Sequence, residues 1–291
     1  MECPDAVLIL GDTDSCLAAI AAKRRRTPVF HMEAGNRCFD ERVPEEINRR
    51  MLDHISDINL PYTEHARRYL LAEGIRPETV LKTGSPMQQV LAAQRGAIRA
   101  SRILETLKLR AGRYFVASAH REENVDDPAR LRRLLAALEA VAERHGHPVV
   151  VSTHPRTRQR LDALRARPSR RLKFLKPLGF PDYIRLQSGA ACVLSDSGTI
   201  TEESSILGFP AVMLRDAHER PEGMDEGTLI MCGIEPRQVL EAVGITLARA
   251  RSGARPARLV LDYDAGDVAR KVVNAISSYR PYVDRVVWRK P

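Results

Sequence analysis

The 291-residue sequence predicts an α/β fold built from two Rossmann-like domains. Short apolar runs rich in β-branched residues alternate with helical patterns, as they do in parallel βαβ units. A helical stretch at residues 90–111 separates these runs into two sets, which indicates a domain boundary. Polar motifs directly follow several of the runs, at the strand ends where α/β sheets bind ligands.

The expected strands follow the order of the apolar runs. The first set is AVLIL, PVFHM, INLPY and TVLKTG, and the second is YFVASA, PVVVST, KFLKPL, ACVLSD, PAVML and TLIMC. We place the two domains at residues 1–92 and 112–265 and a helical connection at 93–111. A C-terminal helix and tail at 266–291 is expected to pack back on the first domain.

Composition limits the kind of partner and compartment. The net charge of +9 allows an anionic partner, but no aromatic side chains alternate with the arginine runs to stack bases, so nucleic acid is not favoured. No apolar run approaches the roughly 20 residues needed to cross a bilayer, and the N-terminus lacks the features of a signal peptide. We therefore expect a cytoplasmic protein that does not bind membranes.

The cysteines predict neither a disulfide framework nor a zinc site. They are odd in number, widely separated and never arranged as C-x-x-C, which favours buried small apolar side chains. The five are Cys3, Cys16, Cys38, Cys192 and Cys232.

The second half places polar residues after three of its strands. His120 follows FVASA, His154 follows VVVST, and the sequence SDSGTITEESS leads from a strand through Ser197-Gly198 into a helix. A small turn at a helix start presents free N–H groups and the positive end of the helix dipole to an anion such as a diphosphate. Glu203 could then reach ribose hydroxyls. An ordinary serine N-cap with a capping-box glutamate explains the same residues, and both interpretations stay open.

The remaining candidates are acidic residues and arginines. Asp12 and Glu33 each follow an apolar strand, and clustered carboxylates suit general acid/base chemistry. Glu45 lies four residues before Arg49 on one helix face, where a surface ion pair is the simpler interpretation. Arg220, in the loop after PAVML, could clamp a phosphate, although a surface arginine is the commoner case.

Six motifs in this order resemble one family, the non-hydrolysing UDP-N-acetylglucosamine 2-epimerases, over nearly the whole chain. They are GDT, HMEAGNR, PEEINRR, SAHREEN, SDSGTITEESS and RDAHERPE. The stretches FHMEAGNRCFDERVPEEINRR, STHPRTR and VVWRK are most similar to the UDP-N-acetyl-L-fucosamine synthase branch, which also inverts C2 of a UDP-linked amino sugar.

The resemblance implies a GT-B-like pair of Rossmann domains that bind a UDP-linked N-acetyl amino sugar in their cleft. It implies no metal, no redox cofactor and a homodimer. Members invert C2 by anti elimination of UDP to a 2-acetamidoglycal, and UDP then adds back after protonation of the other face.

The resemblance also implies roles for single residues. Asp12, Glu33 and Glu45 correspond to the acidic catalytic residues, and His120 to the catalytic histidine near the diphosphate. The implied binding residues contact the diphosphate (Ser197, Gly198), the ribose (Glu203), a phosphate (Arg220), the cleft (Arg49) and the uracil (Tyr183).

The chain departs from the family at its start. Members normally carry a strand and a GTRPE-like loop well before the GDT motif, so we expect the first domain to be incomplete at its N-terminus. Two alternatives follow: a GT-B glycosyltransferase that shares the diphosphate turn, and a non-catalytic remnant that binds nucleotide sugar or a partner. The three carboxylates favour an epimerase over a transferase, whereas the missing segment favours the remnant.

Overall fold

The computed structural model describes residues 4–165, 168–252 and 257–290. The chain forms two compact units, each assembled from separate stretches of sequence. Unit 1 contains the residues up to Val90, Glu219–Glu222 and the residues from Val260 onward, and unit 2 contains Leu91–His218 and Gly223–Leu259. Glu219–Glu222 thus belongs with unit 1, although the sequence analysis includes it in the second domain.

Unit 1 has a three-stranded parallel sheet in the order β1-β2-β3. Its strands are β1 (Val7–Leu10), β2 (Val29–Met32) and β3 (Ile58–Leu60). Its helices are η1 (Asp14–Leu17), α1 (Ala18–Arg24), α2 (Pro44–Ile55), α3 (Glu64–Ala72), η2 (Pro77–Thr79), α4 (Met87–Ala93, which runs into unit 2), η3 (Leu261–Tyr263) and α14 (Val268–Val286).

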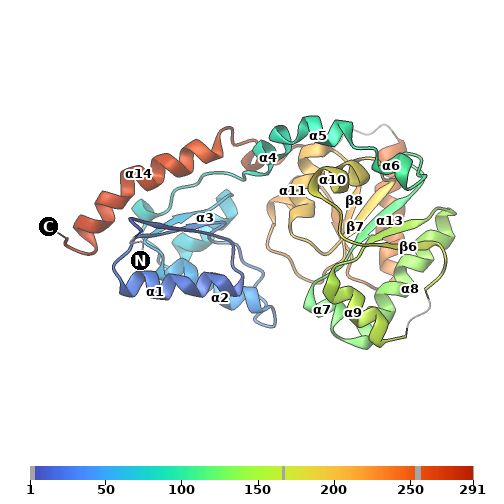
Figure 1. Ribbon diagram of the computed structural model, residues 1–291, viewed down its shortest axis with the longest axis horizontal. Helices are drawn as coiled ribbons and strands as arrows, with labels where there is room; N and C mark the ends of the chain where they lie inside the picture. Colours follow the sequence, from blue (N-terminus) through green and yellow to red (C-terminus); the bar gives the residue numbers. More distant parts are fainter. Residues whose placement is uncertain (1–3, 166–167, 253–256, 291) are drawn as a thin grey trace. The chain divides into compact units, whose positions relative to one another are not determined.

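The central strand β2 is buried on both faces. Phe30 lies in an apolar cluster with Val272 of α14, whereas Val29 packs in another cluster with Leu52 of α2. This alternation is the period of two expected for a strand covered on both sides. In Figure 1, α1 and α2 accordingly lie on one side of the sheet and α14 on the other. Residues that follow β2 therefore start from a rigid position.

The prediction of a full strand at TVLKTG is wrong. The segment makes a single isolated bridge, between Val80 and Asn59. The N–H groups of Leu81 and Thr83 donate to the carbonyls of Asn59 and Pro61 at 2.9 and 3.0 Å, as in a parallel pair. Pro61 has no N–H to donate back, so the ladder stops there.

Unit 2 has a six-stranded parallel sheet in the order β6-β5-β4-β7-β8-β9. Each of the six runs expected in this half forms a strand: β4 (Phe115–Ser118), β5 (Val149–Ser152), β6 (Leu172–Leu175), β7 (Cys192–Ser195), β8 (Ala211–Met213) and β9 (Ile230–Met231). The helices are α5 (Arg95–Ala100), α6 (Ile103–Thr106), α7 (Glu122–Val125), α8 (Pro128–His145), α9 (Pro155–Ala163), α10 (Phe180–Ser188), α11 (Thr199–Leu207), α12 (Glu222–Asp225) and α13 (Pro236–Arg251).

The sheet of unit 2 reverses its direction of growth between β4 and β7. From β4 the chain adds β5 and β6 on one side and β7, β8 and β9 on the other, and helices cover both faces. Ser118 and Ser195, at the carboxyl ends of β4 and β7, are register partners across this switch point. Ligands of open α/β sheets bind beyond the strand ends at such a point.

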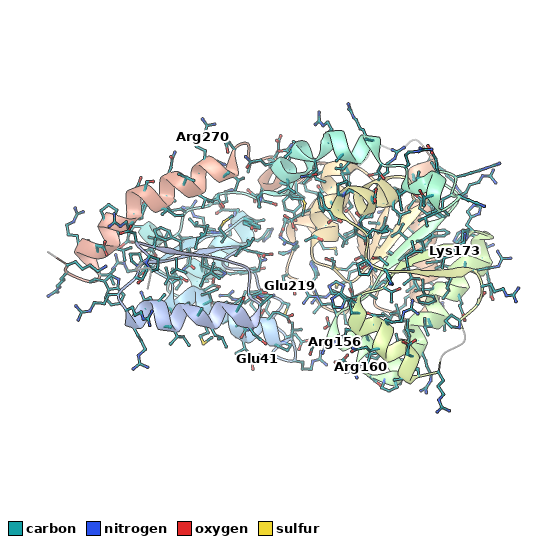
Figure 2. All side chains as sticks on the ribbon, viewed as in Figure 1. Glu41, Arg156, Arg160, Lys173, Glu219 and Arg270 are labelled. Atoms are coloured by element: carbon teal, nitrogen blue, oxygen red, sulfur yellow. The ribbon has the colours of Figure 1, made fainter. Side chains whose placement is uncertain are left out.

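Carboxylates neutralise part of the positive charge. Arg156 and Arg160 project from α9 (Figure 2), and both form ion pairs with Asp126, at 2.9 and 3.1 Å. These interactions lower the pKa of Asp126: the largest contribution is the hydrogen bond from Arg160, and Arg156 adds to it.

Four cysteines are free: Cys16 and Cys192 are buried, and Cys38 and Cys232 are half-buried. Cys3 lies outside the described residues. Within the described ranges, no group of histidine, cysteine and carboxylate side chains is arranged to hold a metal ion. The same ranges contain no helix that is both long and apolar enough to cross a membrane.

Candidate active site

Two carboxylates of unit 1 lie at the carboxyl ends of adjacent strands. Asp12 follows β1 after one glycine, and Glu33 follows β2 directly; β1 and β2 are parallel, so both emerge at the same edge. Gly11, between β1 and Asp12, leaves room for the Glu33 side chain. A Cβ at this position would lie 3.3 Å from Oε2 of Glu33, and the backbone φ of 73° also favours glycine.

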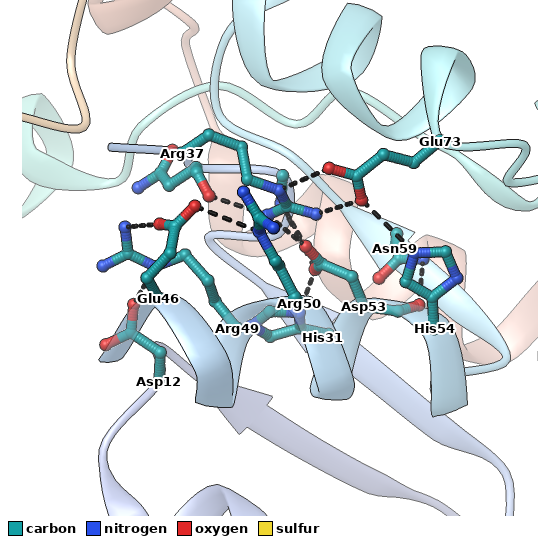
Figure 3. Close-up of polar contacts among 12 residues, drawn as sticks. Asp12, His31, Arg37, Glu46, Arg49, Arg50, Asp53, His54, Asn59 and Glu73 are labelled. Carbon is teal, nitrogen blue, oxygen red and sulfur yellow. Dashed lines mark hydrogen bonds and ion pairs between the residues drawn. The ribbon is translucent and has the colours of Figure 1, made fainter. Parts of the chain in front are cut away.

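Arg49 forms ion pairs with several carboxylates, including Asp12 and Glu46 (Figure 3). Its Nε donates to Asp12 Oδ2 at 2.8 Å, and its Nη1 donates to Glu46 Oε2 at 3.1 Å. Glu219 completes the set with an ion pair of 3.5 Å. Burial alone would lower the pKa of Arg49, but Asp12, Glu219 and Glu46 raise it above its ordinary value. The side chain is only 4% exposed, so the interpretation of Arg49 as a surface residue is wrong.

Glu46 fixes the loop between β2 and α2. Its carboxylate accepts hydrogen bonds from the backbone N–H groups of Cys38 at 3.0 Å and Phe39 at 3.3 Å. Because Glu46 also binds Arg49, the loop, the helix and Asp12 form one connected network. Glu45, its neighbour in the first turn of α2, is half-buried.

Glu33 pairs with the other predicted arginine. Nη2 of Arg220 donates to Glu33 Oε1 at 2.7 Å, and the Asn36 side-chain amide donates to the same oxygen at 3.3 Å. Glu33 has a left-handed backbone with φ of 69°, a conformation that costs a non-glycine residue about 1–2 kcal/mol. Such strain persists only where surrounding contacts hold it. Arg220, expected at a phosphate, therefore lies in unit 1 beside a carboxylate.

A pocket of about 240 Å³ opens beyond the switch point of unit 2. Its wall carries many hydroxyl groups together with two imidazoles and one carboxylate, which suits a polar ligand with many hydrogen-bond acceptors and donors. The lining residues are Ser118, His120, Ser152, His154, Pro177, Tyr183, Gln187, Ser195, Ser197, Thr199 and Glu203.

The serine-glycine turn begins α11 at this pocket. Gly198 is the N-cap residue, and no side chain forms a capping hydrogen bond there. The Ser197 hydroxyl instead lies 3.0 Å from the Thr199 hydroxyl. The serine-cap interpretation is therefore wrong, and Ser197 and Thr199, at the positive end of α11, line the pocket.

His120 is oriented by Asp196, a fully buried carboxylate. Asp196 accepts hydrogen bonds from the backbone N–H groups of His120 and Arg121 at 3.0 Å and from the Asn124 amide at 3.2 Å. His120 Nδ1 lies 3.2 Å from Asp196 Oδ1. Burial alone would raise the pKa of Asp196, but the hydrogen bonds and charge of His120, with those from Arg121 and Asn124, lower it. The imidazole is 39% exposed, so its far edge is accessible to a ligand.

Glu203 and Tyr183 lie on the same wall of the pocket. Nε2 of Gln187 donates to Glu203 Oε2 at 2.9 Å, which fixes this buried carboxylate. Burial raises the pKa of Tyr183, and the charge of Glu203 adds to the effect. Tyr183 also packs against an apolar core cluster, so it has both a structural environment and access to the pocket.

The predicted residues therefore form two groups. Unit 1 contains Asp12, Glu33, Glu45, Arg49 and Arg220, and unit 2 contains His120, Tyr183, Ser197, Gly198 and Glu203.

The sequence analysis did not single out three residues of these networks: Asp196, Glu46 and Glu219. Asp196 could have been found, because it directly follows a strand in the motif that supplied Ser197. Glu46 could not be separated from Glu45 by position alone.

Comparison with known proteins gives a consistent result. The family described as UDP-N-acetylglucosamine 2-epimerase matches residues 1–277. A UDP-N-acetylglucosamine 2-epimerase of Methanocaldococcus jannaschii is 34% identical over 269 residues, covering 88% of this chain and 72% of the relative.

Solved structures have the same fold. The structure of a UDP-N-acetylglucosamine 2-epimerase from Rickettsia bellii matches with a TM-score of 0.91 and 49% identity, over 99% of this chain and 77% of that one. The Methanocaldococcus jannaschii enzyme in complex with UDP-GlcNAc and UDP matches with a TM-score of 0.85 and 31% identity, over 93% and 76% of the two chains.

Proposed function

Because the chain belongs to the UDP-N-acetylglucosamine 2-epimerase family, we propose that it inverts C2 of a UDP-linked N-acetylhexosamine. The proposed reaction interconverts UDP-N-acetylglucosamine and UDP-N-acetylmannosamine. One observation carries the proposal: Asp12 and Glu33 lie at adjacent strand ends, and each has its own buried arginine, Arg49 and Arg220. The reaction needs groups that take and return a proton, held among cations.

The chemistry proceeds by elimination and addition. A carboxylate removes the C2 proton, the C1–O bond breaks, and UDP leaves with the bonding electrons, which gives a 2-acetamidoglycal. A second acid protonates C2 on the opposite face, and the UDP oxygen bonds to C1 again. Asp12, Glu33 and Glu45 are the proposed proton donors and acceptors. Holding the departing UDP close allows it to return.

The pocket of unit 2 is the proposed nucleotide site. The N-terminus of α11 at Ser197-Gly198 suits the diphosphate, and His120, held by Asp196, supplies a further donor. Glu203 and Tyr183 both line this pocket, which supports the proposal that Glu203 accepts hydrogen bonds from the ribose hydroxyls and that the Tyr183 ring contacts the base. We retain Arg220 as a phosphate ligand in this proposal. When substrate binds, its guanidinium would give up the ion pair with Glu33 and bind a phosphate of UDP instead.

The comparisons do not favour the glycosyltransferase and remnant alternatives, because the relatives are named as epimerases.

The exact sugar is a separate question. Resemblance to the UDP-N-acetyl-L-fucosamine synthase branch supports a 6-deoxy substrate as the second candidate. Family resemblance also supports a cytoplasmic homodimer that supplies a sugar nucleotide for polysaccharide synthesis. Light scattering after gel filtration tests whether the protein is a dimer.

Proton NMR in D₂O tests the proposed function. UDP-N-acetylglucosamine incubated with the protein is expected to lose its C2 proton signal to deuterium and to give a second anomeric signal from the C2 epimer. Glu33→Gln serves as the matched control, since it keeps the side-chain size but cannot take the proton. Retention of the C2 proton in both samples contradicts the proposal. Repeating the assay with 6-deoxy UDP-amino sugars identifies the substrate.

A further inference from the structure

Asp53, a buried carboxylate of α2, contacts His31 and Arg37 (Figure 3), which lie on either side of Glu33 in the sequence. Its side chain is completely buried, and its contacts come from residues on both sides of Glu33 in the sequence. His31 Nδ1, from β2, donates to Asp53 Oδ1 at 2.8 Å. The Gly35 N–H donates to Oδ1 and Oδ2 at 3.2 and 3.1 Å.

Arg37 connects Asp53 to Asn36, at the other end of the turn that contains Glu33. Its Nη1 donates to Asp53 Oδ2 and to the backbone carbonyl of Asn36, both at 2.7 Å. Asn36 in turn donates from its side chain to Glu33 Oε1. A continuous path of hydrogen bonds thus connects the Asp53 carboxylate to the carboxylate of Glu33.

The other side of Arg37 is anchored to α3. Its Nε and Nη2 donate to the two oxygens of Glu73, the C-cap residue of α3, at 2.7 and 2.6 Å. The Arg37 side chain is fully buried, whereas that of Glu73 is 27% exposed. Charge-assisted pairs of this two-pronged kind restrict geometry strongly.

The backbone of the turn requires such support. Glu33 and Gly35 both have left-handed φ angles, 69° and 81°. A Cβ on Gly35 would lie 2.4 Å from the carbonyl oxygen of Ala66, so the turn fits closely against α3. A strained, tightly fitted turn holds its shape only as long as its surroundings fix it.

We propose that Asp53 is the positioning residue for Glu33, acting through the Gly35 N–H and through Arg37. The proposal rests on the proposed function, in which Glu33 exchanges a proton with C2. Misplacement of a reacting group by about 1 Å can cost on the order of 100-fold in rate. Asp53 does not touch substrate in this account, so its loss affects turnover through the placement of Glu33 alone.

A matched control lies at the other end of β2. Asp57 is also buried, accepts a hydrogen bond from the Val29 N–H at 2.9 Å and pairs with Lys23 at 2.5 Å. Asp53→Asn and Asp57→Asn therefore each remove one buried carboxylate charge that contacts β2, at His31 beside Glu33 in one case and at Val29 in the other. If Asp53→Asn fails to fold because Arg37 loses its partner, Asp53→Asn/Arg37→Met removes both charges together.

The first readout is amide hydrogen exchange, which does not depend on activity. Asp53→Asn is expected to speed exchange at Gly35 at least tenfold while Val29 is unchanged, and Asp57→Asn is expected to do the reverse. Unchanged exchange at Gly35 in Asp53→Asn overturns the proposal. This result stands even if the wild-type protein shows no turnover, an outcome that would contradict the proposed function instead.

The second readout is a kinetic double-mutant cycle. Asp53→Asn is expected to lower kcat about 10- to 100-fold, whereas KM and the Kd for UDP stay within twofold of wild type. The control Asp57→Asn is expected to have a kcat close to that of wild type. In a Glu33→Gln background the same change is expected to cost less than a further twofold. A full additional loss in that background, or a proportionate loss of UDP affinity, marks Asp53 as structural only.

Discussion

The replacement Asp196→Asn is expected to destabilise unit 2 by about 3.5–5 kcal/mol at pH 7. The carboxylate accepts hydrogen bonds from two backbone N–H groups and one side-chain amide in a fully buried site. An asparagine has a single acceptor oxygen, so one charge-assisted bond of about 1.5–3 kcal/mol is lost. The other two fall from charge-assisted to neutral strength, about 1 kcal/mol each.

The effect depends on pH with a defined sign. The folded pKa of Asp196 lies below its ordinary value: burial alone would raise it, but the hydrogen bonds and the charge of His120 outweigh that effect. Its contribution to stability is complete above the unfolded pKa of about 3.9 and is lost as the pH falls through the lowered folded value. The wild type and the variant therefore differ fully above about pH 5, and the difference begins to shrink only below about pH 4 and disappears below the lowered folded pKa.

Urea unfolding followed by circular dichroism, in steps from pH 7 to about pH 2, measures this difference. Asp216→Asn is the control, because the Asp216 side chain is 62% exposed and pairs with Arg130 at the surface. Its effect is expected to stay within about 0.5 kcal/mol. A loss below about 1 kcal/mol for Asp196→Asn, or a loss that does not change with pH, would refute the assignment of an ionised carboxylate beneath His120.

Three further outcomes are expected. Glu33→Gln lowers kcat about 100-fold or more while calorimetry shows nearly unchanged UDP affinity, and a parallel loss of UDP binding would mark Glu33 as structural. Arg220→Ala weakens UDP binding by about 1.5–3 kcal/mol in the same calorimetric assay, and unchanged affinity removes this residue from the nucleotide site. Gly35→Ala lowers Tm more than Gly74→Ala, since both have left-handed φ but only Gly35 has an atom of Ala66 within 3 Å of the added Cβ; equal shifts contradict the tight fit.

Local sequence was sufficient to predict most of the architecture. Strands such as β4 and β7 are short, mostly apolar and buried on both faces, and this pattern needs no knowledge of distant residues. The one wrongly predicted strand, at Val80, depended on a proline elsewhere in the sequence: Pro61 lies opposite this segment and cannot complete the ladder. Order along the chain likewise predicted that Asp12 and Glu33 follow strands.

Pairing within the candidate site was not predictable in the same way. Arg220 and Glu33 are 187 positions apart, and neither sequence environment indicates the other. Asp53 lies in the helical stretch MLDHIS, where a charged residue usually faces solvent, and only the packing of β2 against α2 shows that it is buried. The sequence at Ser197 is compatible with two structures, and only the position of the N-cap at Gly198, with no capping hydrogen bond from a side chain, separates them.

The division of the chain between the units determines the order in which they can fold during synthesis. The apolar face of β2 and β3 in unit 1 is covered by α14, which emerges only after the whole of unit 2 has been made. At about 5–20 residues per second, roughly 10–40 s pass between the synthesis of Leu60 and that of Val268. During that interval Phe30 and Ile58 lack the helix against which they pack in the folded protein. Unit 1 completes this core only after unit 2 has been made, so the uncovered apolar face depends on protection from aggregation during that interval.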